Sequence, residues 1–174
     1  MTNELKEFLS RKDIKDSLVG GNLRYCFQQL EEKDNKDKLC LLSELNQVLI
    51  DSGTDPFSYI DRIYNFQYYH NENLKSIVIP NNITSIGHES FRFCDNLTSV
   101  IIPSSVKSIG TWAFGWCDEL TDIDIPDSVR IIGADAFFGC VGLTNVTIPK
   151  RFKDDIEMIF GNLGIVEDIN FTFI

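Results

Sequence analysis

The sequence predicts an α+β repeat solenoid that is preceded by a helical N-terminal segment. A pattern of 23 residues recurs in the second half of the chain, where 97–117, LTSVIIPSSVKSIGTWAFGWC, matches both 74–94 and 120–140. Each copy begins with the alternating apolar pattern of a half-buried strand. The first 59 residues lack this repeat and show apolar spacings typical of helices instead. Stacked coils behind a helical segment are therefore the predicted architecture.

The 23-residue period is set by a few residue types that return at fixed places. A leucine opens each copy, a proline follows the strand, and a glycine, a phenylalanine and a cysteine come later. The sets are Leu74, Leu97, Leu120 and Leu143; Pro80, Pro103, Pro126 and Pro149; Gly87, Gly110 and Gly133; Phe91, Phe114, Phe137 and Phe160; and Cys94, Cys117 and Cys140. Proline ends a strand because it has no N–H to donate and a fixed φ. One copy cannot bury its apolar face alone, so the stacked copies should close a continuous core.

The repeats divide the chain into two predicted domains. Residues 1–59 form a helical N-terminal cap or, alternatively, a separate binding head, with helical patterns in 2–19, 22–32 and 36–53. The solenoid covers 60–174, as a half-repeat 60–72, full repeats 73–95, 96–118 and 119–141, a degenerate repeat 142–164 and a terminal strand 165–174. The degenerate repeat loses its glycine and has helical spacing from Ile156 to Leu163, which predicts a short helix there.

The repeat unit L-x-x-I-x-I-P-x-x-V-x-x-I-G-x-x-A-F-x-x-C resembles the BspA-type (Treponema-type) leucine-rich repeat family over about residues 74–171. This resemblance implies a right-handed solenoid with a parallel β-sheet on one face and irregular turns on the other. It also implies a binding surface for other proteins, because family members generally act in that way and the repeat carries no catalytic residue.

Composition and motifs argue against several classes of function. The formal net charge of −10 would repel a nucleic-acid backbone or an anionic membrane, so neither is expected as a direct partner. The charged N-terminus has no apolar signal region and the five cysteines form no secreted disulfide pattern, so a cytoplasmic, reduced protein is expected. His70 and His88 are the only histidines, and no nucleophile, metal or phosphate-binding motif is present, so no enzyme activity is expected. One cysteine per copy predicts a buried column rather than a metal site, and no cofactor is expected.

Two surfaces are candidates for protein binding. The outward positions of the predicted sheet include Val78, Ile101, Asp122 and Asp124, and the full set is Ser76 and Val78, Ser99 and Ile101, Asp122 and Asp124, Asn145 and Thr147, and Asp168 and Asn170. The turn side carries Trp112 and Trp116, and Trp112 stands where the neighbouring copies have Glu89 and Asp135. Tryptophan is enriched among binding hot spots. A solvated sheet face and a ring lying flat on the next coil are the simpler alternatives.

The sequence therefore favours a non-catalytic scaffold that binds another protein. One alternative is an inhibitor, of a phage or mobile-element type, whose acidic face blocks a basic nucleic-acid-binding surface of its target. A second alternative is a fragment of a cell-surface adhesin. The salt dependence of partner binding would separate the acidic inhibitor from a scaffold with an apolar interface.

Overall fold

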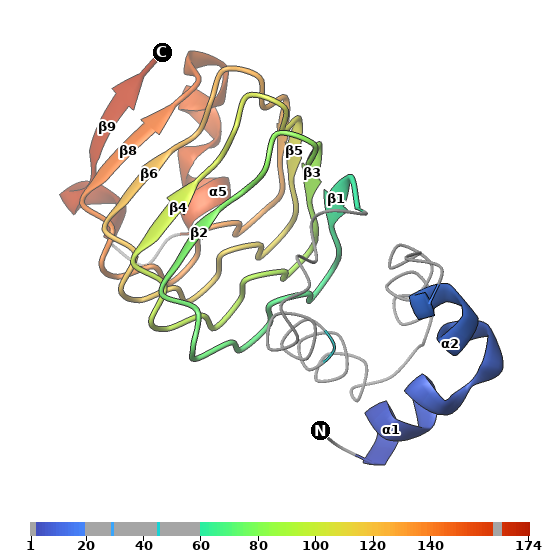
Figure 1. The fold of residues 1–174 in the computed structure, drawn as a ribbon. Coiled ribbons are helices and arrows are strands. Elements are labelled where there is room, and N and C mark those ends of the chain that lie inside the picture. Colours follow the sequence, from blue (N-terminus) through green and yellow to red (C-terminus); the bar gives the residue numbers. More distant parts are fainter. Residues whose placement is uncertain (1–2, 20–28, 30–44, 46–59, 162–164) are drawn as a thin grey trace.

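The computed structural model describes residues 3–19, 29, 45, 60–161 and 165–174. From residue 60 onward the chain winds into stacked coils, which Figure 1 shows side by side. One side of the coils carries the labelled strands β2, β4, β6, β8 and β9, which span Ser76–Val78, Ser99–Ile101, Asp122–Asp124, Asn145–Ile148 and Asn170–Phe173. Every strand pair in the described part of the chain is parallel. The parallel sheet implied by the resemblance is therefore present.

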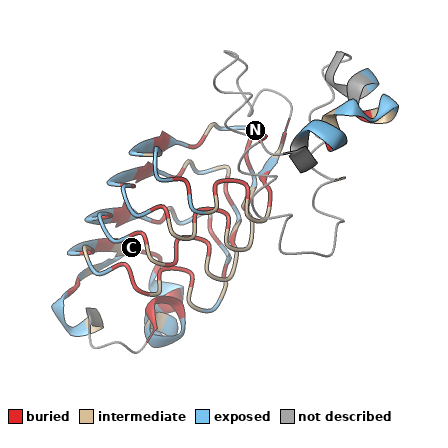
Figure 2. Cartoon of the chain, turned by 90° about the horizontal axis from the view of Figure 1, so that it is seen from below, coloured by how far each residue is buried: buried red, intermediate tan, exposed pale blue. Residues whose placement is uncertain are grey.

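This side of the solenoid is divided into two hydrogen-bonded sheets. Strand β2 pairs with β4, and β6 pairs with β8, which pairs with β9. Strands β4 and β6 lie next to each other without a ladder between them. The middle residue of each short strand points inward and is buried, as Ile77, Val100 and Ile123 show. The flanking residues point outward, so the outer face of all five strands is exposed or half-exposed (Figure 2).

A second sheet lies on another side of the coils, where the sequence predicted only turns. Its strands β1, β3, β5 and β7 contain two residues each and pair in that order; they are Arg62–Ile63, Ser85–Ile86, Ser108–Ile109 and Ile131–Ile132. The second residue of each strand is buried. Ile63 aligns with Ile86, so the predicted half-repeat does continue the stack by one coil. A strand of two residues is too short to show the alternation from which strands are predicted.

The third side of each coil is a turn that contains two residues with positive φ. The pairs are Phe66 and His70, Glu89 and Phe93, Trp112 and Trp116, and Asp135 and Gly139. Alternate N–H groups along each turn donate to the next coil, for example from Trp112 to Ala134 O at 3.2 Å and from Phe114 to Ala136 O at 2.8 Å. These hydrogen bonds connect the turns of neighbouring coils, as a ladder connects neighbouring strands. They also fix the directions of the side chains that the turns carry.

Columns of like side chains fill the core between the three sides, among them a column of rings and a column of cysteines. The rings of Tyr68, Phe91, Phe114, Phe137 and Phe160 stack one on the next, with centroids 5.0 to 5.2 Å apart. Each of Cys94, Cys117 and Cys140 is a free, buried thiol, as the 23-residue spacing predicts. The core is therefore built from identical layers, in which each residue type packs on its own copy in the next coil.

The coil that leads into β9 departs from the 23-residue period. It contains the 3₁₀ helices η2 and η3 and the short helix α5, which span Lys150–Asp155, Ile165–Asp168 and Ile156–Phe160. The predicted helix is thus present in α5. Asn145 on β8 aligns with Asn170 on β9, which is 25 positions later. The coil with the helical turns is therefore two residues longer than the 23-residue repeat. The predicted outward pair Asp168 and Asn170 is therefore wrong: the outward pair is Asn170 and Thr172, and Asp168 ends η3.

The N-terminal segment begins with two helices where the sequence indicated one. Helix α1 spans Asn3–Ser10 and α2 spans Lys12–Val19, with a bend at Arg11. The apolar spacing widens between Leu9 and Ile14, so one straight helix could not keep both on the same side. The predicted helices 22–32 and 36–53 lie outside the described residues except for Gln29 and Leu45, both helical. No helix in the described ranges is long and apolar enough to cross a membrane.

Candidate functional site

The sheet face brings together four of the six residues that the sequence singled out. Val78 on β2 aligns with Ile101 on β4, and Asp122 and Asp124 lie on β6, the neighbouring strand. The side chains all point outward because they flank the buried middle residue of each strand. Trp112 and Trp116 lie on the turn side of the coil instead. The six residues therefore form two separate surfaces.

The first surface contains two large apolar side chains that lie side by side. Val78 and Ile101 keep 64% and 57% of their surface exposed. Their neighbours at the start of the same strands are the serines Ser76 and Ser99, which are also in register. In the next coil, Asp124 occupies the position that Val78 and Ile101 hold in theirs. We call Val78, Ile101 and Asp124 the sheet-face row.

The other acid of β6 is held by its neighbours. Thr121 Oγ1 donates to one carboxylate oxygen of Asp122 at 2.6 Å, and Asn145 Nδ2 donates to the other, also at 2.6 Å. These hydrogen bonds lower the pKa of the Asp122 carboxyl, and the bond from Thr121 contributes more than the bond from Asn145. Asn170 Nδ2 extends the ladder to Asn145 Oδ1 at 3.4 Å. Asp122 thus links neighbouring coils, whereas Asp124 stands exposed at the other end of the strand.

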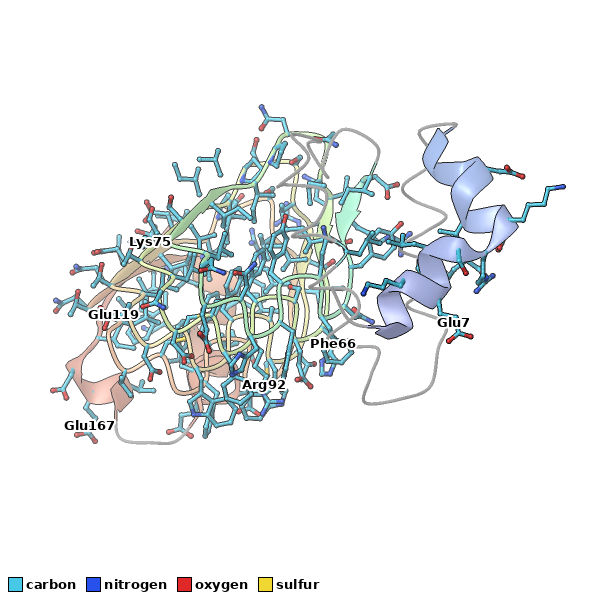
Figure 3. The ribbon with its side chains drawn as sticks, turned by 60° about the horizontal axis from the view of Figure 1, so that its bottom comes forward. Glu7, Phe66, Lys75, Arg92, Glu119 and Glu167 are labelled. Atoms are coloured by element: carbon cyan, nitrogen blue, oxygen red, sulfur yellow. The ribbon has the colours of Figure 1, made fainter. Side chains whose placement is uncertain are left out.

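The second surface is an aromatic cluster around Arg92 on the turn side (Figure 3). The guanidinium carbon of Arg92 lies 4.7 Å from the ring centroids of Phe93 and Trp116 and 4.8 Å from that of Trp112. Glu89 Oε2 accepts a hydrogen bond from Arg92 at 2.7 Å and completes the cluster. A cation close to several ring faces gains energy from the ring quadrupoles. Arg92 was not among the predicted residues.

The two tryptophans of this cluster are engaged by other rings. Trp116 stacks on Phe93 and on Trp112, with both centroid distances at 5.0 Å and interplanar angles of 17° and 11°. Phe138 from the next coil contacts both indoles at 4.9 and 5.2 Å. Each tryptophan is half-buried. Much of the indole surface is thus used within the molecule, but Trp112 does not lie flat on the next coil: it stacks on Trp116 of its own coil and is tilted by 59° against Phe138.

The three thiols of the cysteine column are buried. Burial raises the pKa of Cys94 to about 12, and burial together with the neighbouring Cys140 raises that of Cys117 well above its usual value. Each thiol donates to a backbone carbonyl of the preceding coil. A protonated thiol is a poor nucleophile and a poor metal ligand. The column therefore serves packing.

The sequence pattern of the BspA-type leucine-rich repeat region matches residues 61–173 in six copies. The chain belongs to the BspA-type leucine-rich repeat family. The match confirms the resemblance that the repeat unit indicated. A protein-interaction scaffold is the general role that membership supports.

Solved structures of other leucine-rich repeat proteins resemble this one. A leucine-rich repeat protein from Bacteroides ovatus ATCC 8483 is 31% identical with a TM-score of 0.59, over 66% of this chain and 28% of that protein. A leucine rich cell surface protein from Faecalibacterium prausnitzii A2-165 is 33% identical with a TM-score of 0.49, over 53% of this chain and 24% of that protein. The chain thus spans about a quarter of the length of either protein. Among curated proteins, none matches it.

Proposed function

We propose that this leucine-rich repeat protein is a non-catalytic binding module that holds a partner protein on the sheet-face row. The observation that carries the proposal is the pair of adjacent, largely exposed apolar side chains, Val78 and Ile101. An exposed apolar pair beside an exposed carboxylate provides both a buried anchor and an orienting charge for a partner. The aromatic cluster is less suitable, because its rings already contact one another.

The spacing of the sheet-face row suits a helix that lies across the strands. Hydrogen-bonded strands are about 4.8 Å apart, so Val78 and Ile101 are separated by about that distance, and Asp124 follows on the neighbouring strand β6. Side chains at i and i+4 on a helix are separated by about 5–6 Å, whereas side chains on one face of a strand repeat at about 6.8 Å. The proposed partner segment is therefore an amphipathic helix with two apolar residues on successive turns and a lysine or arginine on the next, opposite Asp124.

A photoreactive amino acid placed at Ile101 tests the surface directly. We expect it to cross-link a host protein in cells, and the cross-linked peptide identifies both the partner and its segment. Ile131 provides the matched control, because it is 63% exposed but lies on β7 in the second sheet. Equal cross-linking of the same protein from both positions, or from Ile131 alone, would contradict the proposal.

Titration of the partner against variants then measures separately how much the apolar pair and the carboxylate of the sheet-face row contribute to binding. Val78→Ser with Ile101→Ser should weaken binding by more than about tenfold, mainly through faster dissociation. Asp124→Asn should slow association and reduce its salt dependence. Glu119→Gln removes an exposed carboxylate from the turn between strands and is the charge control. Wild-type affinity in the double serine variant would overturn the assignment.

The inhibitor of a basic, nucleic-acid-binding surface is a second proposal with a different expected signature. Its support is the net charge of −10 together with the acidic step on β6. It predicts an association rate that falls steeply with salt and is reduced equally by Asp124→Asn and by removal of other surface acids. The sheet-face row, which has a single carboxylate, predicts a shallow salt dependence instead.

The protein could work in the cytoplasm or, as a fragment of an adhesin, on the cell surface. We propose the cytoplasm, supported by the free thiols of Cys94, Cys117 and Cys140. Fractionation of the native producing cells with an antibody to this chain checks the location. Recovery from the medium or the outer surface would favour the adhesin.

A further inference from the structure

Two cationic side chains lie in neighbouring coils at the corner where the chain turns from β4 and β6 into β5 and β7. Lys107 comes directly before β5 and Arg130 directly before β7, and Arg130 N donates to Lys107 O at 2.8 Å. Both residues are exposed. Two like charges side by side repel each other. The stability of the fold therefore does not account for this pair.

Backbone carbonyls hold the two charged groups in equivalent places. Lys107 Nζ donates to Ser104 O at 3.1 Å, and Arg130 Nη1 donates to Asp127 O, also at 3.1 Å. A lysine has three donors and an arginine has five, and within the described residues each side chain uses one of them. Most of their N–H groups therefore remain available to a ligand, although the side chains are already ordered.

A third cation reaches the same place from the next coil. Arg151 in η2 donates from Nη1 to Asp127 O at 3.2 Å and to Val129 O at 2.9 Å. Its guanidinium and that of Arg130 therefore meet at one carbonyl oxygen. Arg151 Nη2 also pairs with the carboxylate of Asp127, whereas Lys107 and Arg130 have no carboxylate partner among the described residues. We call Lys107, Arg130 and Arg151 the basic corner.

The charges around the basic corner limit what it can bind. Carboxylates and lysines both surround it, on η2, at the end of β6 and two coils before Lys107. They are Asp61, Asp124, Asp127, Asp154 and Asp155 among the acids and Lys150 and Lys153 among the bases. A long polyanion or an anionic membrane would meet these carboxylates as well as the cations, on a chain whose net charge is −10. A small, doubly charged group can contact the cations alone.

We propose that the basic corner binds a phosphorylated serine or threonine of a partner protein, with the phosphate bridging Lys107 and Arg130. A phosphate monoester carries about −1.5 to −2 charges at neutral pH and has three acceptor oxygens, so it matches two cations that lack a carboxylate partner. Hydrogen-bonded strands are about 4.8 Å apart, which lets two oxygens of one phosphate each reach one cation. Recognition of phosphorylated segments by clustered cations is a recurrent binding mode. The corner excludes Val78 and Ile101, so this inference goes beyond the proposed function and does not depend on it.

The test is capture of the full chain by two immobilised peptide libraries that differ at one position. One library has phosphoserine between random residues, and the other has serine in its place. The phosphoserine library should retain the wild type and the serine library should not. Equal retention by both libraries, retention by neither, or capture by phosphatidylserine vesicles in place of the phosphopeptides would overturn the inference.

Charge removal then ties the binding to the corner. Lys107→Gln with Arg130→Gln should weaken the affinity for a phosphopeptide selected from the library by more than about tenfold, measured by fluorescence anisotropy. Arg62→Gln with Lys75→Gln is the matched control, because it removes the same charge from two exposed residues elsewhere and should leave the affinity unchanged. Wild-type affinity in the first pair, or an equal loss in both pairs, would contradict the assignment.

A variant that tightens binding guards against one that merely unfolds. Asp127→Asn removes the carboxylate from Arg151 and leaves the backbone carbonyls that hold its guanidinium. The affinity for the phosphopeptide should rise by about threefold or more, which a damaged fold would not produce. Val78→Ser with Ile101→Ser should bind the phosphopeptide as the wild type does, so a failure of the sheet-face row is distinguishable from a failure of the basic corner. Weaker binding by Asp127→Asn would contradict the arrangement.

Discussion

The thiol of Cys117 donates a hydrogen bond to the backbone carbonyl of Phe91 in the preceding coil, with sulfur and oxygen 3.2 Å apart. Cys94 and Cys140 repeat this contact with Tyr68 O and Phe114 O, each at 3.0 Å. The acceptor residues belong to the column of stacked rings, so each cysteine links the cysteine column to the ring column. A carbonyl left without this donor in the buried core would lose a hydrogen bond. The cysteines therefore stabilise the stacking of coils through these hydrogen bonds.

The first prediction is that the described cysteines resist modification in the folded protein. A maleimide reacts with the thiolate, and both the burial of the sulfur and the raised pKa of Cys94 and Cys117 keep that form scarce. Brief native labelling followed by mass spectrometry should leave Cys94, Cys117 and Cys140 unmodified, and labelling in urea should modify all three. Rapid native labelling of Cys117 would show that the column opens.

The second prediction concerns stability at high pH. The pKa of Cys94 rises from 9.0 to about 12 on folding, so the folded state holds this proton in a range where the unfolded state releases it. The stabilisation is complete below pH 9.0 and is lost as the pH rises toward 12, by about 1.4 kcal/mol per pH unit for this thiol. Urea unfolding of the wild type and Cys94→Ala should show a shallower decline for the variant. The comparison uses the slope of unfolding free energy against pH, because the other groups that titrate in this range are the same in the wild type and the variant. Equal slopes would contradict the raised pKa of Cys94.

The regular part of this fold could be predicted because the repeat constrains it strongly. An inward isoleucine, a ring and a thiol at each 23-residue step lead to stacked columns, and Phe114 between Phe91 and Phe137 shows that arrangement. The register of β9 could not be predicted, since the period does not say how many residues a helical insertion uses. Asp168 was misplaced for that reason.

The candidate site was only partly accessible from the sequence. Strand alternation gives the outward positions of Val78 and Asp124, but it does not say which of them a partner touches. The cluster around Arg92 depends on the positive φ of Phe93, Trp112 and Trp116, which aims their rings at one guanidinium. Non-glycine residues seldom adopt this conformation, so no propensity rule predicts it.

The third prediction is that Gly110 sets the spacing between coils. A Cβ added to Gly110 would lie 2.6 Å from the backbone of Gly87 and His88, which cannot move without separating the strands. Gly110→Ala should therefore lower the free energy of unfolding by about 1–3 kcal/mol, as overpacking does. Gly115→Ala is the matched control, because its Cβ would meet a ring atom of Trp112 at 3.0 Å and that ring can shift. Urea unfolding measures both, and an equal cost would show that backbone contact is not the cause.

The last prediction is that Arg92 and Trp112 stabilise the solenoid jointly. The Nε atom of Arg92 is buried without a hydrogen-bond partner, so the ring faces and Glu89 hold its guanidinium on the turn side. A double-mutant cycle with Arg92→Met and Trp112→Leu should give a coupling free energy of about 1 kcal/mol by urea unfolding. Methionine keeps much of the apolar stem, so the coupling reports the cation rather than lost packing. The same cycle with Arg130→Met, an exposed arginine that donates to Asp127 O, should give no coupling. If the costs of Arg92→Met and Trp112→Leu simply add, the guanidinium gains nothing from the indole and the cluster is held together by the stacking of its rings alone.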